Sequence, residues 1–180
     1  MVTSSGPDAA SALSSSNVVK YVHRLVKIHP HNSLLLMISG HQMLASRTFG
    51  LAGAYYLKAL EHHQDNSMLH LCLGVVSLLR SMQRLSHNRH AQIAEAFAFL
   101  YHYCNLRGRS QEALYNIGRA YQHLGLYNVA IESYKEALRT AVGPQESDFS
   151  YEAAYNLHLI YVNCGAPQLA ARAIETYLVV

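Results

Sequence analysis

Histidine is the residue type in this chain most able to bind a metal ion, and there are twelve histidines. His87 and His90 lie three residues apart and could share one helix face, while His62, His63 and His70 flank a turn. Zinc prefers about four ligands in a compact set, usually including cysteine. The chain has no CxxC, HExxH or paired Cys–His spacing. The sequence therefore predicts no metal site, and we interpret the histidines as surface or capping residues.

The other candidates for chemistry are three cysteines and one short loop. Cys72, Cys104 and Cys164 lie in apolar helical context, which is typical of inert buried thiols rather than nucleophiles. Segment 106–110, LRGRS, lacks the pattern of a phosphate-binding loop, so Ser110 is expected to cap the helix that follows. The sequence thus predicts no catalytic residue, no cofactor, no small-molecule substrate and no enzymatic activity.

Composition narrows the class of protein. The longest apolar run, residues 69–79, is too short to cross a bilayer, which needs about 20 residues. An odd number of cysteines without a secretory segment favours a reducing compartment and no membrane contact. Residues 1–109 carry ten Lys/Arg and four Asp/Glu, whereas residues 110–180 carry four and seven. The basic half could face nucleic acid or an acidic protein, but its charges are scattered, which favours a solvated face.

Any functional residue must be positioned by helices, because no alternating strand pattern bounded by turns is present. The stretch 115–138, YNIGRAYQHLGLYNVAIESYKEAL, is typical of one tetratricopeptide repeat, a pair of antiparallel helices about 34 residues long. We number the positions of the repeat from Gln111 and call this numbering the frame. In this frame, small residues lie where the two helices approach each other, and tyrosines fill the space beside them. The residues predicted to pack this repeat are Gly118, Tyr121, Gly125, Ala130, Tyr134 and Ala137.

The same frame recurs along the chain. Gly40 and Gly74 occupy the mid-helix glycine position and lie one repeat apart. In the last repeat His158 replaces the small residue, which should loosen that helix pair. The further residues predicted to pack the first and last repeats are Ala52, Tyr56 and Ala59, and Tyr161, Gly165, Ala170 and Ile174.

The predicted fold is all-α, a right-handed superhelix of tetratricopeptide repeats with about nine helices. Residues 1–16, rich in Ser and Ala, should be disordered, and residues 17–180 should form the solenoid. A helix over residues 18–29 has no partner helix before it and should end at Pro30. Extra residues in the second repeat should lengthen its two helices and the basic elbow between them, residues 80–90.

A groove for a partner protein is the main predicted site. In such repeats the first helix of each pair lines the concave surface, at frame positions two, five, nine and twelve. In the first two repeats these positions are almost wholly apolar: Leu34, Met37, His41 and Leu44, then Met68, Leu71, Val75 and Leu78. In the last two they are mixed: Glu112, Tyr115, Arg119 and Gln122, then Glu152, Tyr155, Leu159 and Val162. Either a partner segment fills the apolar part or the superhelix closes over it.

Segments outside the generic repeat resemble one family, the tetratricopeptide-repeat subunit of general transcription factor IIIC (polypeptide three), at its C-terminal region. They are ISGHQMLASRTFGLA, RHAQIAEAFAFLYHYCNLRG with SQEALYNIGRAYQHLGL, and AAYNLHLIYVNCGAPQLAARAIETYL. The family polypeptide is several times longer. The resemblance implies a nuclear, non-enzymatic scaffold that supports complex assembly and transcription initiation by RNA polymerase III. It implies other subunits of that factor and components of factor IIIB as partners, and an indirect association with DNA.

One alternative function stays open from the residues alone. A tetratricopeptide adaptor of the co-chaperone kind grips acidic C-terminal peptides with Lys, Asn and Arg in its groove. Asn116 and Arg119 fit that clamp loosely, whereas Met37, Leu71 and Val75 offer no clamp.

Overall fold

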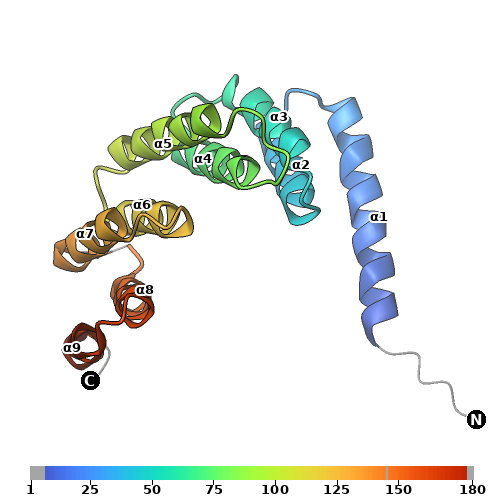
Figure 1. Cartoon of the computed structure of the whole chain (residues 1–180). Helices are drawn as coiled ribbons and strands as arrows, with labels where there is room; N and C mark the ends of the chain where they lie inside the picture. Colours follow the sequence, from blue (N-terminus) through green and yellow to red (C-terminus); the bar gives the residue numbers. More distant parts are fainter. Residues whose placement is uncertain (1–6, 145, 178–180) are drawn as a thin grey trace, which may run out of the picture. The chain divides into compact units, whose positions relative to one another are not determined.

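A computed structural model describes residues 7–144 and 146–177, and the described part consists of α-helices and loops without a strand. The prediction of an all-α chain with nine helices is confirmed for these residues (Figure 1). The helices are α1 Pro7–Ile28, α2 Ser33–Ala45, α3 Phe49–Leu60, α4 Ser67–Ser81, α5 Arg89–Leu106, α6 Gln111–His123, α7 Tyr127–Arg139, α8 Ser150–Asn163 and α9 Pro167–Tyr177.

Three of the helices begin where a side chain accepts a hydrogen bond from the first turn. Asn32 caps α2 by accepting from the backbone N–H of Leu35, and Asn66 caps α4 in the same way. Ser110 accepts from the backbone N–H of Ala113, which confirms its predicted role as the cap of α6. Each cap satisfies a donor that the first helical turn leaves without a partner.

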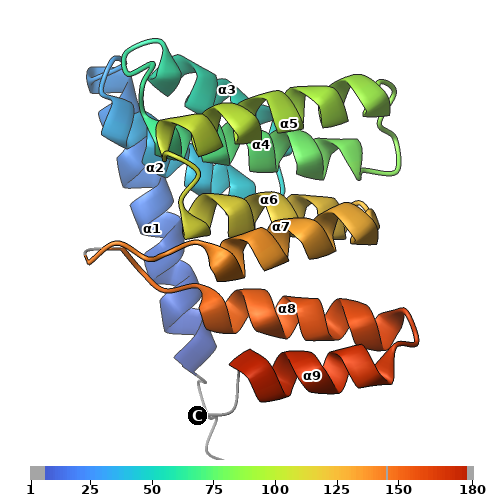
Figure 2. The same ribbon diagram turned by 90° about the vertical axis from the view of Figure 1, so that its left-hand side faces the viewer.

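The chain forms two compact units that divide within α5, residues 1–97 and residues 98–180. In the first unit α3 packs against both α2 and α4, and α1 packs against α2. In the second unit α7 packs against both α6 and α8, and α8 pairs with α9 (Figure 2). The core of each unit is built from small residues and tyrosines that face each other across helix pairs, such as Gly40 and Tyr56, or Gly118 and Tyr134.

The N-terminal helix is longer than the sequence indicated. The prediction was disorder over residues 1–16 and a helix from Val18, whereas α1 begins at Pro7. Proline is favoured in the first helical turn and the following Ala, Ser and Leu residues continue a helix readily, so local propensity allows this extension. Residues 1–6 lie outside the described part of the chain. The proposed domain boundary at residue 16 stays a prediction.

The second repeat is lengthened as predicted. Its helices α4 and α5 have 15 and 18 residues, whereas α2, α3, α6 and α7 have 12 or 13. The elbow between them, residues 82–88, has seven residues where the other three pairs have three, and the Ser86 hydroxyl donates to the Gln92 side chain there. The extra residues therefore extend helices more than they extend the loop.

Two helix pairs close on a glycine and a tyrosine that are 16 residues apart. A Cβ atom added to Gly40 would lie 2.3 Å from Cε1 of Tyr56, and one added to Gly118 would lie 2.8 Å from Cε1 of Tyr134. Both tyrosine side chains are fully buried. The predicted packing role of these glycines follows from this contact, because only a residue without a side chain leaves room for the ring.

The turns of three helix pairs, α2–α3, α6–α7 and α8–α9, share one backbone feature. Gly125 and Gly165 follow α6 and α8 with φ of +74° and +71°, and Arg47 follows α2 at the equivalent place with φ of +58°. After Gly125 the N–H of Leu126 bonds back to the carbonyl of Tyr121, which satisfies an unpaired carbonyl at the helix end. Gly125 therefore ends the helix as the sequence predicts.

His158 contacts the second helix of the last pair directly. Its Nδ1 donates to the carbonyl oxygen of Ala170 on α9 over 3.0 Å, and α8 and α9 remain in close contact. Ile174 occupies the repeat position that holds a buried tyrosine in the repeats of Gly40 and Gly118. In the last repeat, therefore, the larger His158 replaces the glycine on the first helix and the smaller Ile174 replaces the tyrosine on the second. That His158 loosens this pair stays a prediction.

The three cysteines differ in exposure, which leads to a prediction for thiol labelling. Cys72 and Cys104 are buried and Cys164 is exposed, whereas the sequence predicted three buried thiols. Burial raises the pKa of Cys72 to about 11 and that of Cys104 above its usual value.

At neutral pH we expect Ellman's reagent to label one thiol rapidly in the native protein and three after denaturation, because the thiolate is the reactive form. Cys164→Ser should abolish the rapid phase, and a rapid phase that persists in this variant would contradict the assignment.

Candidate functional site

The groove residues predicted in the first unit lie at the surface of α2 and α4 with graded exposure. Leu34 is 70% exposed and Met68 is 47% exposed. His41 is exposed and its Nδ1 lies 2.6 Å from the hydroxyl of Tyr56. Half-buried members are Met37, Leu44, Leu71 and Val75, whereas Leu78 is buried. The first unit therefore presents apolar side chains to solvent from both helices.

The predicted groove residues of the second unit are not equally available to a partner. Tyr115 is 8% exposed, because its ring is stacked on Phe149 and tilted against Tyr134. The Tyr115 hydroxyl accepts a hydrogen bond from Asn156 over 3.2 Å. Arg119 is exposed and its guanidinium carbon lies 5.9 Å from the centre of the Tyr115 ring. Tyr115 therefore positions Arg119 through a cation–π contact, and little of its own side chain is accessible to a partner protein.

The exposed aromatic of this unit is Tyr155 on α8. Its side chain is 47% exposed and its ring is stacked parallel to that of Tyr151. Glu152 and Val162 on the same helix are also exposed, and Leu159 is half-buried. Together with Arg119 these residues give the second unit a mixed polar and aromatic surface.

A polar cavity of about 400 Å³ lies beside Arg119 in the second unit. Its walls come from α6, α7 and α8, and every lining side chain can form hydrogen bonds. Gln122 also accepts a hydrogen bond from the buried hydroxyl of Tyr134. The lining residues are Arg119, Gln122, His123, Tyr127, Asn156 and Asn163. Sequence reasoning named Arg119 and Gln122 but missed the other four, whose only signal was their polar side chains on repeat helices.

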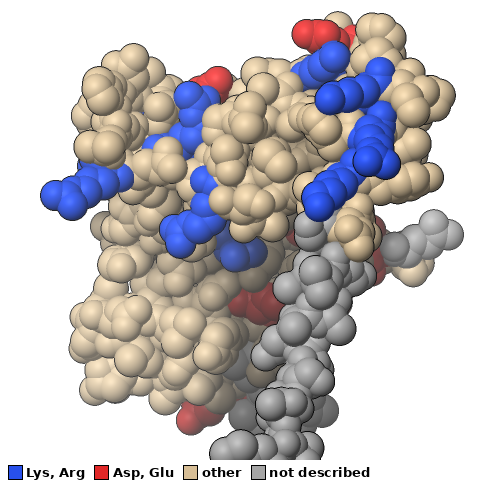
Figure 3. All heavy atoms as spheres, turned by 90° about the vertical axis from the view of Figure 1, so that its right-hand side faces the viewer, with Lys and Arg blue, Asp and Glu red and all other residues tan. Residues whose placement is uncertain are grey.

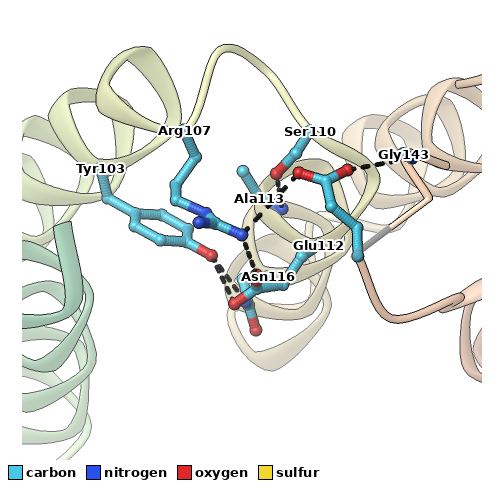
Figure 4. A network of polar contacts seen from close by, with 8 residues as sticks. Tyr103, Arg107, Ser110, Glu112, Ala113, Asn116 and Gly143 are labelled. Carbon is cyan, nitrogen blue, oxygen red and sulfur yellow. Dashed lines mark hydrogen bonds and ion pairs between the residues drawn. The ribbon is translucent and has the colours of Figure 1, made fainter. Parts of the chain in front are cut away.

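Glu112, a predicted groove residue, and Asn116, considered for a carboxylate clamp, belong to an internal network (Figure 4). Glu112 accepts from the Tyr103 hydroxyl and from the Arg107 guanidinium, both over 2.9 Å. Asn116 donates to the same Tyr103 hydroxyl over 3.3 Å. Burial raises the pKa of Tyr103, so this hydroxyl remains a protonated donor. Of the two residues considered for a carboxylate clamp, only Arg119 is thus exposed.

Three named proteins match this chain over most of its length. The transcription factor tau subunit sfc4 of Schizosaccharomyces pombe is 40% identical over 167 residues, covering 83% of this chain and 17% of that protein. General transcription factor 3C polypeptide 3 of Homo sapiens is 33% identical over 164 residues, covering 88% and 18%. The transcription factor tau 131 kDa subunit of Saccharomyces cerevisiae is 35% identical over 142 residues, covering 76% and 14%. This chain is a homologue of these transcription factor IIIC subunits.

The sequence resemblance to the tetratricopeptide subunit of factor IIIC is thereby confirmed. The chain spans less than a fifth of the length of each of these relatives. That the matching part is their C-terminal region stays a prediction.

Comparison of folds agrees with the repeat assignment. The family model described as tetratricopeptide repeat matches residues 111–141, the pair α6 and α7. TTC0263, a thermophilic TPR protein of Thermus thermophilus, superposes with a TM-score of 0.67 at 17% identity, covering 93% of this chain and 86% of that one. MamA superposes with a TM-score of 0.64 at 16% identity, covering 97% and 93%. At such identities the likeness shows the fold alone, and that fold is the predicted one.

Several histidines of this factor IIIC homologue have local structural partners. His70 is buried, with Nε2 2.8 Å from the carbonyl oxygen of Gln64, and His87 is bonded to the carbonyl of Leu85. His31 and His62 meet edge to face. Among the described residues no three His, Cys, Asp or Glu side chains gather in a way that could hold a metal ion.

The basic side chains of the homologue are mostly dispersed. Figure 3 shows Lys and Arg side chains at several separate places on this face, with a short row of them above the grey atoms. Lys20, Arg24 and Lys27 on α1 are all exposed or half-buried. A dispersed arrangement of cations is what we expect of a solvated surface. It does not test whether this surface contacts DNA. In the described part of the chain, no helix is both long and apolar enough to cross a bilayer.

Proposed function

We propose that this chain acts as a non-enzymatic scaffold subunit of transcription factor IIIC, or as part of one. Its homology to three such subunits, at 33–40% identity over most of its length, carries this proposal. The repeat fold supports it, because stacked helix pairs expose extended surfaces suited to holding other proteins. The scaffold supports assembly of the complex and initiation by RNA polymerase III in the nucleus. Its partners are other subunits of the factor and components of factor IIIB, and it meets DNA through the complex.

The apolar surface of the first unit is the part of the scaffold that binds a sibling subunit. Five side chains carry it, and they are Leu34, Met37, Met68, Leu71 and Val75. Leu34 and Met68 are largely exposed, so covering them would remove apolar area from water at about 25 cal/mol per Å². An amphipathic helix is a suitable occupant, since its apolar face fits side chains presented by neighbouring helices. In the second unit, Arg119 and Tyr155 add polar and aromatic contacts, with Tyr115 positioning Arg119.

A pair of charge substitutions tests this surface. Leu34→Glu with Met68→Glu should leave the fold intact, because exposed substitutions usually change stability by no more than about 0.5 kcal/mol. Association with factor IIIC from nuclear extract should fall by about tenfold or more, as each carboxylate would have to be buried against an apolar partner. Immunoblots for the sibling subunits after affinity capture give the measurement.

The matched control is Leu51→Glu with Leu57→Glu on α3. Both leucines are about as exposed as Met68, at 53% and 47%, and lie on the second helix of the same pair as Leu34. This variant should capture the sibling subunits at the level of the parent chain. If the Leu34 and Met68 variant also captures them at that level while folded, the surface does not bind the complex.

A further inference from the structure

A second concave feature lies on the second unit, away from the predicted groove. It is a cavity of about 320 Å³ walled by α7, α8 and α9. Lys135 and Arg139 line it from α7, Leu157 and Tyr161 from α8, and Leu169 and Arg172 from α9. The predicted groove lies on first helices of the pairs, whereas this cavity takes two of its walls from the second helices α7 and α9.

Three cations converge on this cavity in the more acidic part of the chain. Lys135 and Arg139 are four residues apart and so share a face of α7, and Arg172 faces the cavity from α9. Lys135 pairs with Glu132 over 3.1 Å, but Glu132 is 68% exposed, and such surface pairs hold their partners weakly. Within the described part of the chain, Arg139 and Arg172 form no ion pair. The cavity therefore has positive charge available for a ligand.

The rest of the cavity lining is apolar and aromatic. Leu157 and Ala173 are buried beneath it, with 3% and 5% exposure. Leu169 and Tyr177 stand at its edge with 47% and 45% exposure. A cavity of about 300 Å³ is at the lower end of the range for ligand sites, large enough for one or two side chains.

We propose that this cavity binds a short acidic segment of a partner protein that carries one apolar or aromatic side chain. The side chain enters between Leu157, Leu169 and Tyr161, and flanking carboxylates meet Arg139, Arg172 and Lys135. Arginine suits this role because its planar guanidinium binds a carboxylate through two parallel hydrogen bonds. The proposal does not depend on the groove of the first unit, nor on which complex the chain joins.

A nucleic acid fits the cavity less well than an acidic peptide. Binding to a phosphate backbone uses a row of cations along the strand, whereas here three cations surround an apolar floor. A peptide can direct its carboxylates to the arginines and its apolar side chain to the floor.

Fluorescence anisotropy on the full chain tests the proposal with a defined probe. The probe is a labelled eight-residue peptide in which Asp and Glu surround one central Phe. We expect it to bind, and to bind at least about tenfold more tightly than the same peptide with Ser for Phe or with Lys for the acids. A labelled single-stranded DNA of eight nucleotides serves as the phosphate probe and should bind more weakly than the acidic peptide.

Variants locate the binding. Arg139→Glu with Arg172→Glu should weaken binding of the acidic peptide by about tenfold or more, since two attractive charges become repulsive. Arg84→Glu with Arg89→Glu, the same charge change at the α4–α5 loop of the first unit, should leave it unchanged. If the first pair lowers the melting temperature, Arg139→Gln with Arg172→Gln takes its place. Equal affinity for all peptides, tighter binding of the DNA, or affinity that both arginine pairs leave unchanged would overturn the proposal.

Discussion

Gly40→Ala should destabilise the first unit by about 1–3 kcal/mol, the usual cost of overpacking a core. The added Cβ would lie 2.3 Å from Cε1 of Tyr56, and the next two ring atoms lie at 2.7 and 2.8 Å. The Tyr56 ring is fully buried and its hydroxyl is held by His41, so it has little room to move. The helix pair must therefore separate to admit one methyl group. Urea denaturation followed by circular dichroism gives the measurement.

Gly50→Ala provides the matched control for this substitution. Gly50 lies on α3 in the same unit, and nothing lies within 4 Å of a Cβ atom placed there. Alanine at this position should leave stability unchanged or raise it, because alanine favours a helix over glycine by up to about 1 kcal/mol. Adding Tyr56→Leu to Gly40→Ala should recover part of the loss, since the double variant removes the ring that the methyl group strikes. Equal midpoints for the Gly40 and Gly50 variants would refute the packing role of Gly40.

Ala130→Asp should be the most destabilising single change considered for this chain. Ala130 is fully buried between α7 and its neighbours, where a carboxylate would lose its hydration. An uncompensated buried charge costs on the order of 3–5 kcal/mol, which is a large part of the total stability of a small domain. We expect loss of the cooperative transition of the second unit, or a much lower midpoint. Ala171→Asp, at an exposed position of α9, should change stability little.

The pH dependence of this variant gives a second readout. Burial would raise the pKa of the new carboxyl above its unfolded value of about 3.9, because the charged form loses its hydration. The folded state then binds the proton more tightly than the unfolded state. The penalty is therefore smallest below about pH 4 and grows as the pH rises from the unfolded-state pKa towards the folded-state pKa. A penalty that is the same at pH 4 and at pH 7, measured against the parent chain, would show that the carboxyl reaches solvent.

The repeat was readable from the sequence because helix pairing makes local demands at fixed spacing. Gly118 and Ala130 are small where two helices meet, and Tyr134 occupies the space that the glycine leaves. These contacts join residues within one helix pair. Their separation in the sequence is therefore fixed by the repeat, and it predicts which residues meet. The same logic predicted that Gly125 ends a helix, since a positive φ is required there.

Features that join different pairs were not readable in this way. Tyr115 occupies a predicted groove position, but Phe149, from the segment before the next pair, stacks on it and leaves it buried. Asn116 has the residue type of a carboxylate clamp, but its side-chain amide donates to the Tyr103 hydroxyl on α5. The start of α1 at Pro7 was not readable for a different reason: the Ser- and Ala-rich segment has no apolar period, so its hydrophobic pattern could not indicate a helix.

The sequence by itself determined the resemblance to factor IIIC subunits, the helical repeat and the glycines that admit a tyrosine in two of the pairs, because these depend on residue types at short, regular spacing. Only the tertiary structure decided which groove residues are exposed, and it alone brought Arg139 of α7 and Arg172 of α9 to one cavity. The reason is that the packing of one pair on the next sets which side chains meet. That packing depends on the combined shape of three helices, and no fixed spacing along the chain encodes it.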